Sequence, residues 1–302
     1  MITIIGSINL DLIARVGRLP GPGETVLGNG FSTAPGGKGA NQALAAARAG
    51  GAVRMIGATG RDSFAGEALA LLKEGGVDLS KVREAAEPTG TALILVGGDG
   101  ENMIAVVPGA NATVEVAEIA AAGLAEGEHI LLQHEIPLAA VEATLAAARE
   151  AGAVTLLNTA PFRAEAAGFL AKADYVIANE TEFDLYAREL SLRGSSREER
   201  MRDFAEGTGH AIVVTLGGEG ALAATPAGLT KVDSLEVTPV DTVGAGDTFC
   251  GYLAAGLAAG LPLDEALSRA AVAGSLACLK PGAQPSIPLK AEVDAALAGR
   301  EA

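Results

Sequence analysis

Short apolar runs alternate with helix-like stretches through the middle of the chain, and this alternation restricts the fold more than any other feature. The runs 130–133, 154–158 and 175–178 have the length and composition of buried strands. Helical patterns cover residues 137–151 and 180–189. Strand–helix–strand units with right-handed crossovers build a parallel sheet that is covered by helices on both faces. The pattern therefore predicts an α/β fold with three layers and a doubly wound, mainly parallel sheet.

Composition limits the kinds of protein this chain can be. Its 302 residues are 49% hydrophobic, which supplies the core of one large or two small domains. No run reaches the roughly 18 apolar residues of a membrane span, and residue 1 leads into a strand without a signal sequence. We expect a cytoplasmic protein that binds no membrane. A net charge of -15 without a lysine or arginine cluster also argues against nucleic-acid binding.

The cysteines and histidines give no sign of a metal centre or a disulfide framework. Cys250 and Cys278 lie far apart in apparent helices, which is typical of small buried hydrophobic side chains. The three histidines, His129, His134 and His210, do not have the spacing of zinc ligands. A zinc site is therefore not expected, and only His134, next to Glu135, is kept as a candidate for another role.

Residues 241–249, with the sequence DTVGAGDTF, combine a sharp glycine turn, a carboxylate and the start of an apolar run. Leu235, Val237 and Val240 alternate with polar residues and predict a strand, and residues 249–261 predict a helix. At such a junction the first N–H groups of the helix point toward an anion, which the helix dipole also favours. Glycines here let the backbone approach a ligand closely.

Asp247 would stand at the mouth of this anion site. A carboxylate next to a bound anion suggests a proton acceptor. The alternative is that Asp247 is only the N-cap of the helix and the glycines only a tight turn, and for this stretch alone that alternative is the stronger one.

Two polar residues follow the first strand, which covers residues 2–5. Asn9 and Asp11 lie near the carboxyl end of that strand, where open α/β sheets bind ligands. Being two residues apart, they face the same side of an extended backbone and could hold neighbouring hydroxyl groups of a sugar. The alternative is a turn closed by their own side chains.

A glycine loop at residues 35–42, PGGKGANQ, precedes a predicted helix at 43–49. It is not a P-loop, because Gly39 follows Lys38 where that motif requires Ser or Thr. A role on the substrate side fits better, with Lys38 and Asn41 donating to hydroxyl oxygens.

Together, residues 6–11, 36–42 and 241–249 resemble the signatures of the ribokinase-like sugar kinases, in the same order and over nearly the whole chain. The resemblance implies that Asp247 is the catalytic base and that Gly244, Ala245 and Gly246 form the anion hole. It also implies a set of sugar ligands, which are Asn9, Asp11, Gly37, Lys38, Asn41, Glu135 and Asp247 itself.

The same resemblance implies sites for a nucleotide and for metal ions. Asn179 and Glu182 match an N-x-x-E motif near magnesium and phosphate, although the pair would also make a good helix start. The residues implied at the nucleotide are Asn179, Glu182, Thr215, Gly217, Gly220 and Gly246. Those implied at a monovalent cation, expected to be K⁺, are Asp241, Val243, Ala277, Lys280, Gly282 and Ser286. Ala271 departs from the family pattern, which has histidine near the adenine.

Residues 91–96 and 103–107, separated by the sequence GGDG, predict a β-hairpin. With the stretch near residues 26–34 they could form a small separate sheet. In the family such a sheet is a lid over the sugar and a dimer contact. We therefore expect one domain over residues 1–302, with lid strands from about 12–34 and 90–108, and a homodimer. The alternative is two more central strands.

The function implied is transfer of the γ-phosphoryl group of ATP to the 5-hydroxyl of D-ribose, with Mg²⁺ and K⁺ as cofactors. The acidic chain would need a divalent cation to bring in nucleotide phosphates. The alternatives are a kinase of the same fold for deoxyribose, fructose, a nucleoside or a sugar acid, and a sugar-binding protein without catalysis.

Overall fold

A computed structural model describes residues 1–300 of the chain. Within them, nine strands form one large sheet in the order β13-β12-β11-β10-β9-β8-β1-β4-β5. The strands from β5 to β11 run parallel, and β12 and β13 extend the sheet antiparallel. Their bounds are β1 (Ile2–Ile5), β4 (Val53–Thr59), β5 (Asp78–Glu84), β8 (His129–Leu132), β9 (Val154–Asn158), β10 (Tyr175–Asn179), β11 (Ala211–Thr215), β12 (Ala221–Thr225) and β13 (Gly228–Val232).

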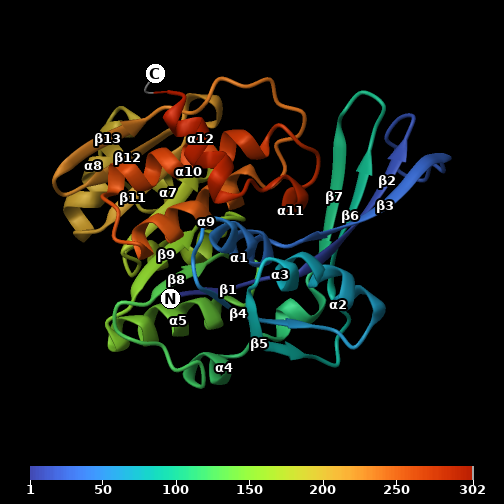
Figure 1. Ribbon diagram of the computed structural model, residues 1–302, viewed down its shortest axis with the longest axis horizontal. Coiled ribbons are helices and arrows are strands. Elements are labelled where there is room, and N and C mark those ends of the chain that lie inside the picture. The colour runs from blue at the N-terminus through green and yellow to red at the C-terminus, as the bar shows by residue number, and fades with distance from the viewer. Residues whose placement is uncertain (301–302) are drawn as a thin grey trace.

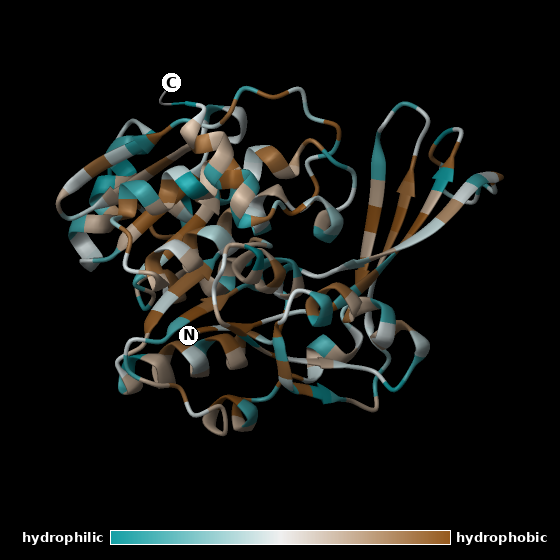
Figure 2. Cartoon of the chain, in the orientation of Figure 1, coloured by the Kyte–Doolittle hydropathy of each residue, from teal (hydrophilic) through white to brown (hydrophobic). Residues whose placement is uncertain are grey.

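Helices cover both faces of this sheet, which confirms the three-layer prediction (Figures 1 and 2). One face carries α1 (Lys38–Arg48), α2 (Ser63–Ala68), α3 (Ala70–Glu74), α9 (Ala245–Ala258), α10 (Leu263–Ala277) and α12 (Lys290–Ala298). The other carries α4 (Val116–Ala120), α5 (Leu138–Ala151), α6 (Ala167–Leu170), α7 (Glu180–Glu189) and α8 (Arg197–Thr208).

The central strands are mainly apolar because each faces two cores. In β9, Leu156 packs into the core with α1 and α9, whereas Leu157 packs into the core with α5 and α7. Successive side chains of a strand point to opposite faces, so a strand covered on both sides has no solvated side. None of the helices within residues 1–300 is both long and apolar enough to cross a membrane.

A second sheet of four strands, in the order β3-β2-β6-β7, stands away from the main body in Figure 1. It consists of β2 (Asn9–Val16), β3 (Gly28–Gly36), β6 (Gly90–Val96) and β7 (Asn102–Val107). The expected hairpin is confirmed, since β6 and β7 pair antiparallel. The alternative of two more central strands is wrong.

The predicted strand around Leu235 and Val240 is wrong. The segment between β13 and α9 is irregular, and its amides bond to α10 and to the residue after it instead of to the sheet. Leu235 N donates to Ser275 Oγ at 3.1 Å, and Val240 N donates to the carbonyl of Cys278 at 2.8 Å. Leu235 and Val237 are partly buried, whereas Val240 is 66% exposed, so the alternation in the sequence does not correspond to a strand register.

In both glycine-rich stretches the helix begins earlier than predicted. α1 begins at Lys38 and not at residue 43, and α9 begins at Ala245 and not at residue 249. The N-cap of α9 is Gly244, whose φ of 78° is in the left-handed region. Asp247 is therefore the third residue of α9, and the interpretation of Asp247 as an N-cap is wrong.

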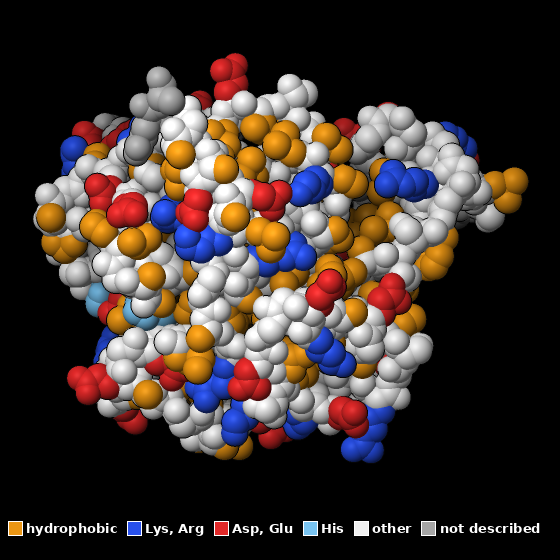
Figure 3. Space-filling model, in the orientation of Figure 1, with side chains coloured by type: hydrophobic (Ala, Val, Ile, Leu, Met, Phe, Trp, Pro, Cys, Tyr) orange, Lys and Arg blue, Asp and Glu red, His pale blue; other side chains and the backbone are white. Residues whose placement is uncertain are grey.

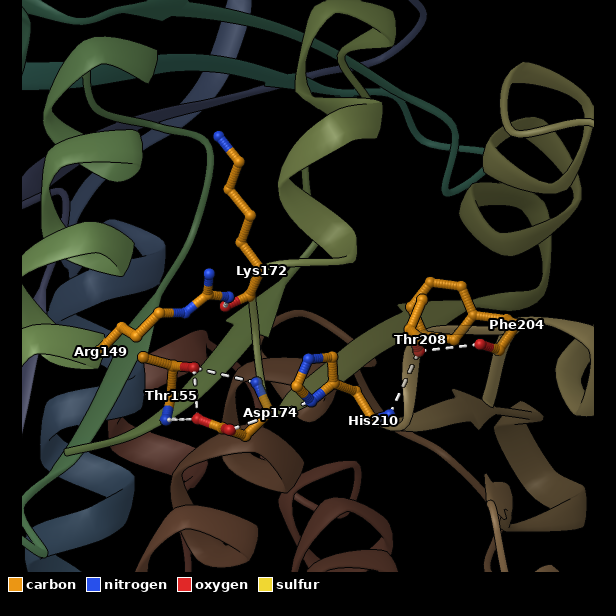
Figure 4. Close-up of polar contacts among 7 residues, drawn as sticks. All are labelled: Arg149, Thr155, Lys172, Asp174, Phe204, Thr208 and His210. Carbon is orange, nitrogen blue, oxygen red and sulfur yellow. Dashed lines mark hydrogen bonds and ion pairs between the residues drawn. The ribbon is translucent and has the colours of Figure 1, made fainter. Parts of the chain in front are cut away.

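A polar cluster ties the amino ends of β9, β10 and β11 together, at the opposite end of the strands from the residues of the candidate site (Figure 4). The carboxylate of Asp174 accepts from both Thr155 N and Thr155 Oγ1 at 2.7 Å. The carbonyl of Asp174 accepts from Ala211 N at 2.9 Å, and His210 Nδ1 lies 4.0 Å from its carboxylate. These bonds hold the register of three strands whose other ends face the candidate site.

Three 3₁₀ turns and one short helix complete the described chain. They are η1 (Gly109–Thr113), η2 (Ala164–Ala166), η3 (Gly217–Glu219) and α11 (Ala283–Ser286). η3 lies in the turn between β11 and β12, and α11 contacts β3 of the small sheet.

Candidate active site

Asp247 is the centre of the site and is almost fully buried in the first turn of α9. Both of its carboxylate oxygens accept hydrogen bonds from α1, which packs beside α9. Asn41 Nδ2 donates to Oδ2 and Gln42 Nε2 donates to Oδ1, each at 2.9 Å. The Asp247 carboxylate is thus held in one orientation by two amides that are 205 and 206 residues away in sequence.

Glycines place α1 against the strand loops. A Cβ on Gly39 would lie 2.6 Å from the carbonyl carbon of Gly6, so only glycine permits this approach. Gly37 has a φ of 88° and would meet Asn9 N at 2.8 Å. The glycines of the loop thus allow close backbone approach, as expected, but the partner in the structure is the chain itself.

Glu135 follows β8 and joins the first helical turn of α1. Its Oε2 accepts from Lys38 N at 3.0 Å and from Ser7 Oγ at 2.5 Å. A carboxylate at a helix N-terminus satisfies an otherwise unpaired amide and interacts well with the helix dipole. Glu135 therefore positions the loop that carries Lys38.

Asn9 and Asp11 lie on β2, with extended backbone, so the alternative of a local side-chain turn is wrong for this pair. The Oδ1 atom of Asn9 accepts from Asn111 Nδ2 at 2.7 Å. Asp11 pairs with Ala34 of β3, and a Cβ on Gly36 would come within 2.5 Å of its Oδ2. Gly36 thus makes room for the Asp11 carboxylate.

The charges of the site influence one another. Burial, together with the negative charges of Glu135 and Asp247, raises the pKa of Asp11 to about 6. The negative charge of Asp247 raises the pKa of Lys38, with a smaller contribution from Glu135. Three carboxylates and one ammonium group are therefore close enough for their charges to interact, and together they can accept and donate several hydrogen bonds.

A small cavity of about 130 Å³ lies at the N-terminus of α9. Its wall includes Lys38, Asn179, Glu182, Gly244 and Asp247. Asn179 and Glu182 also start α7, because Asn179 Oδ1 accepts from Glu182 N at 2.8 Å and Glu182 Oε2 accepts from Asn179 N at 3.0 Å. The helix-start interpretation is confirmed, and the pair still faces the cavity.

A larger cavity of about 350 Å³ adjoins the first one, since Thr215 and Gly246 line both. The implied nucleotide residues Gly217 and Gly220 lie in its wall, together with Phe249, Ala271 and Cys278. A large pocket with aromatic and small side chains next to a small polar one suits a flat heterocycle joined to a charged chain.

One expected donor of the anion hole is already engaged. Ala245 N donates to the carbonyl of Thr242 at 3.2 Å, so its amide closes the turn before α9. Gly244 lies in the wall of the small cavity, and Gly246 lies where the two cavities meet. These two glycines remain the candidates for contact with phosphoryl oxygens.

Asp241 joins the two loops that the resemblance assigns to a monovalent cation. Its Oδ1 accepts from Val243 N at 3.0 Å, and its Oδ2 accepts from Gly282 N at 2.8 Å. Ser286 Oγ donates to the carbonyl of Ala283, whereas the Lys280 side chain pairs with Glu292. The loop before α9 and the loop after α10 are thus adjacent, and Lys280 could serve a cation only through its backbone.

Sequence reasoning missed a group of buried polar residues behind the site, namely Ser7, Gln42, Asn111, Gln133 and Asn158. Ser7 and Gln42 lie within residues 6–11 and 36–42, but nothing in either stretch distinguishes them from their neighbours, and Asn111, Gln133 and Asn158 stand in no recognisable local pattern. His134, by contrast, has no contact with the site: it packs against Tyr186, and desolvation lowers its pKa to about 4. Cys250 is buried, as expected of a small hydrophobic side chain.

A carboxylate in the first turn of a helix, a group of hydrogen-bonding side chains around it and two adjoining cavities suit a phosphotransferase that acts on a polyhydroxylated acceptor. The sequence matches the pfkB family of carbohydrate kinases over residues 1–290, and the chain belongs to this family.

Characterised relatives and solved structures agree with this assignment. The chain is 37% identical to the ribokinase of Lactococcus lactis, over 98% of this chain and 96% of the relative. The ribokinase structure from Thermotoga maritima superposes with a TM-score of 0.92 at 30% identity, covering 99% of each chain. The Arabidopsis thaliana ribokinase, solved with ribose and ATP, gives a TM-score of 0.84 at 31% identity, covering 98% of each chain.

Proposed function

We propose that the protein is an ATP-dependent ribokinase, which transfers the γ-phosphoryl group to the 5-hydroxyl of D-ribose. The observation that carries this proposal is the placement of Asp247. Its carboxylate lies in the first turn of α9 and in the wall of the small cavity, and its charge acts on Asp11. The small cavity adjoins the larger one, which is lined by Gly217 and Gly220. Similarity to ribokinases over almost the full length supports ribose as the acceptor.

In the proposed reaction, Asn9, Asp11, Lys38, Asn41 and Glu135 hold the sugar hydroxyl groups. Asp247 accepts the proton of the primary hydroxyl as its oxygen bonds to the γ-phosphorus and the bond to the departing ADP oxygen breaks. The amides near Gly244 and Gly246 stabilise the charge on the transferring group, which is spread over its oxygens in a loose transition state. Positioning therefore matters more than a strong base.

Two kinds of metal ion fit the residues present. Magnesium, when bound with the nucleotide, supplies charge neutralisation, and Asn179 and Glu182 would hold it from the wall of the small cavity. The described residues contain no cluster of three or more His, Cys, Asp or Glu side chains suited to a metal. The potassium site would be made mainly of backbone carbonyls around Asp241 and Gly282.

Potassium is expected to raise kcat about tenfold over sodium alone, equivalent to ~1.4 kcal/mol of barrier, by ordering the loop between Asp241 and Gly246. The physical reason is that the Asp241 carboxylate already joins this loop to Gly282, so an ion bound there fixes the α9 N-terminus. Initial rates in KCl, NaCl and choline chloride at equal ionic strength measure the effect. Equal rates in all three salts contradict it.

Sugar affinity is expected to fall in acid. The pKa of Asp11 is raised to about 6, and only its ionised form offers both oxygens as hydrogen-bond acceptors without an O–H donor. Below pH 6 the carboxyl group binds a proton, so the Kd for ribose rises by up to about tenfold per pH unit. Calorimetric titration with ribose between pH 5 and 8 checks this. Asp11→Asn serves as the control, since its affinity should be lower but independent of pH; the same acid dependence in that variant would exclude Asp11 as the cause.

The small sheet is proposed to form a homodimer contact. One of its faces carries exposed apolar side chains, including Phe31 at 71% and Met103 at 51% exposure, which stand in one row across the sheet with Ala14 and Leu95 between them (Figure 3). A contiguous apolar patch of this kind is typical of a protein–protein interface. Light scattering is expected to give twice the chain mass, and Met103→Glu is expected to give the monomer. A monomeric native protein contradicts the proposal.

A coupled assay of ADP release tests the proposed function as a whole. We expect turnover with ribose to exceed that with deoxyribose, fructose and ribonucleosides. If deoxyribose or a nucleoside is preferred, the family assignment stands and the acceptor changes. If no sugar stimulates ADP release, the chain is a sugar-binding protein without catalysis.

A further inference from the structure

Gln42, on the first turns of α1, is fully buried behind the Asp247 carboxylate. Its Nε2 donates to Asp247 Oδ1 at 2.9 Å and to Asn158 Oδ1 at 3.1 Å. Its Oε1 accepts from Gln133 Nε2 at 2.5 Å. Every polar atom of this side chain is used inside the protein, so Gln42 has nothing to offer a sugar.

The direction of these hydrogen bonds is fixed at both ends. An ionised carboxylate only accepts, so the amide nitrogen of Gln42 must face Asp247. Asn158 Nδ2 donates to the carbonyl of Ile177 at 3.2 Å, which leaves its oxygen facing Gln42. The oxygen of Gln42 therefore faces Gln133, whose own Oε1 has no hydrogen-bond partner within the described chain.

A missing side chain makes room for this arrangement. A Cβ on Gly6 would lie 2.0 Å from Gln133 Oε1, so the end of β1 must be followed by glycine for Gln133 to reach Gln42. The row of amides from Gln133 through Gln42 to Asp247 is thus a built feature of the fold. It links the ends of two central strands to the candidate base.

Asn41 contacts the other oxygen of Asp247 in a different way. Its Nδ2 donates to Oδ2 at 2.9 Å, but its Oδ1 is buried without a hydrogen-bond partner in the described residues. Asn41 can therefore exchange partners when a hydroxyl group arrives, whereas Gln42 cannot. Oδ2 becomes available to the hydroxyl, and Oδ1 stays held.

We propose that Gln42 is a positioning residue for phosphoryl transfer: it fixes Oδ1 of Asp247 from the protein interior, so that Oδ2 is the oxygen that accepts the hydroxyl proton. This inference rests on the proposed function, because it assigns Asp247 as the base. The roles of the two neighbouring amides are then separate. Asn41 acts in sugar binding, and Gln42 acts only through Asp247.

The test uses Gln42→Glu, which keeps the shape of the side chain and replaces its donor by a carboxyl group. Two carboxyl groups in contact share a proton, so the acid limb of the kcat profile should move to higher pH by at least about one unit. Other charged or titratable groups near Asp247 are Lys38 from α1, Asp11 from β2, Glu135 after β8, Glu182 from α7 and Cys250 from α9. The substitution leaves all five in place.

Gln133→Glu is the matched control. The same change is made at the next side chain of the hydrogen-bonded row, which bonds to Gln42 and not to Asp247. A buried carboxyl group there stays protonated and can still donate to Gln42 Oε1. Its acid limb should coincide with that of the native protein. An unshifted limb in Gln42→Glu, or an equal shift in both variants, overturns the proposal.

A readout without turnover separates this proposal from the proposed function. The ¹³C resonance of the Asp247 carboxyl group, assigned by its loss in Asp247→Asn, is titrated in native protein and in Gln42→Glu; its midpoint should rise in the variant. If ribose is not phosphorylated but this midpoint rises, the substrate assignment fails and the contact stands. If ribose is phosphorylated and the midpoint does not move, the role of Gln42 fails.

Gln42→Met covers the case in which Gln42→Glu does not fold. It fills the same space without a donor, and we expect kcat to fall at least about tenfold while the Kd for ribose changes less than about threefold. A purely structural role would lower Tm and leave kcat of the folded protein unchanged, and that result overturns the proposal.

Discussion

Asp247→Asn lowers kcat by at least ~10²-fold and leaves nucleotide binding close to that of the native protein, the range expected for loss of a positioned general base. The amide cannot take the hydroxyl proton, but it occupies the same volume in the first turn of α9. Of the two donors that hold the carboxylate, Asn41 Nδ2 and Gln42 Nε2, one would face the new NH₂ group. Losing one such bond costs about 1–3 kcal/mol, which a protein of this size can absorb.

The measurement is single-turnover transfer with saturating ATP and ribose, together with calorimetric titration by ADP. Asp11→Asn is a suitable control, because it makes the same chemical change on β2 in the same pocket. Its effect should fall mainly on the KM for ribose, as expected for a group that contacts the sugar away from the reacting oxygen. Turnover near the native rate in Asp247→Asn would remove Asp247 from its assigned role.

The second large effect is expected from two glycines only two residues apart. Gly246→Ala should retain or raise Tm but lower kcat/KM for ATP at least about tenfold. Gly246 is helical, and a Cβ there meets no atom within 4 Å, so alanine is tolerated and favours the helix by up to ~1 kcal/mol. Gly246 also lies where the two cavities meet, so the methyl group would take space needed by the phosphate chain.

Gly244→Ala, unlike Gly246→Ala, should lower the stability of the protein. Its φ of 78° costs an L-residue about 1–2 kcal/mol, and its Cβ would lie 2.9 Å from Ala283. The contact between the α9 N-terminus and α11 must then shift, so both Tm and kcat should fall. Thermal melts and steady-state kinetics of the two variants side by side check the pair. If Gly246→Ala has native kinetics, the phosphate chain does not pass this residue.

The parts of the fold that could be predicted from the sequence are those whose pattern has one physical cause. Strands such as β9 and β10 are mainly apolar because both faces are buried, and α7 begins and ends where predicted. β12 was not predicted, because Ala221–Thr225 is rich in alanine, which favours helices, and only pairing with β11 makes it a strand. The segment near Leu235 shows the reverse case, because its alternating sequence predicts a strand but the segment is irregular in the structure.

The same distinction holds for the site. Asn9, Asp11 and Glu135 follow strands, so their convergence at one edge of the sheet could be predicted, and the glycine turn marked Asp247. Gln42 and Gln133 could not be found in this way. They are 91 residues apart, and only the hydrogen bond between them in the folded chain indicates a role at the site. For a related reason α9 begins four residues before the predicted start, because the sequence of its first turn is typical of a glycine loop.

Analysis of the product tests the central claim most directly. The protein is incubated with ATP, magnesium, potassium and D-ribose labelled with ¹³C at carbon 5, and the product is observed by ³¹P and ¹³C NMR. The proposed function predicts a phosphate monoester coupled to carbon 5, formed in equal amount with ADP and formed at least ~10²-fold more slowly by Asp247→Asn. ADP formation without that coupling, or no reaction with ribose where another sugar reacts, would contradict it.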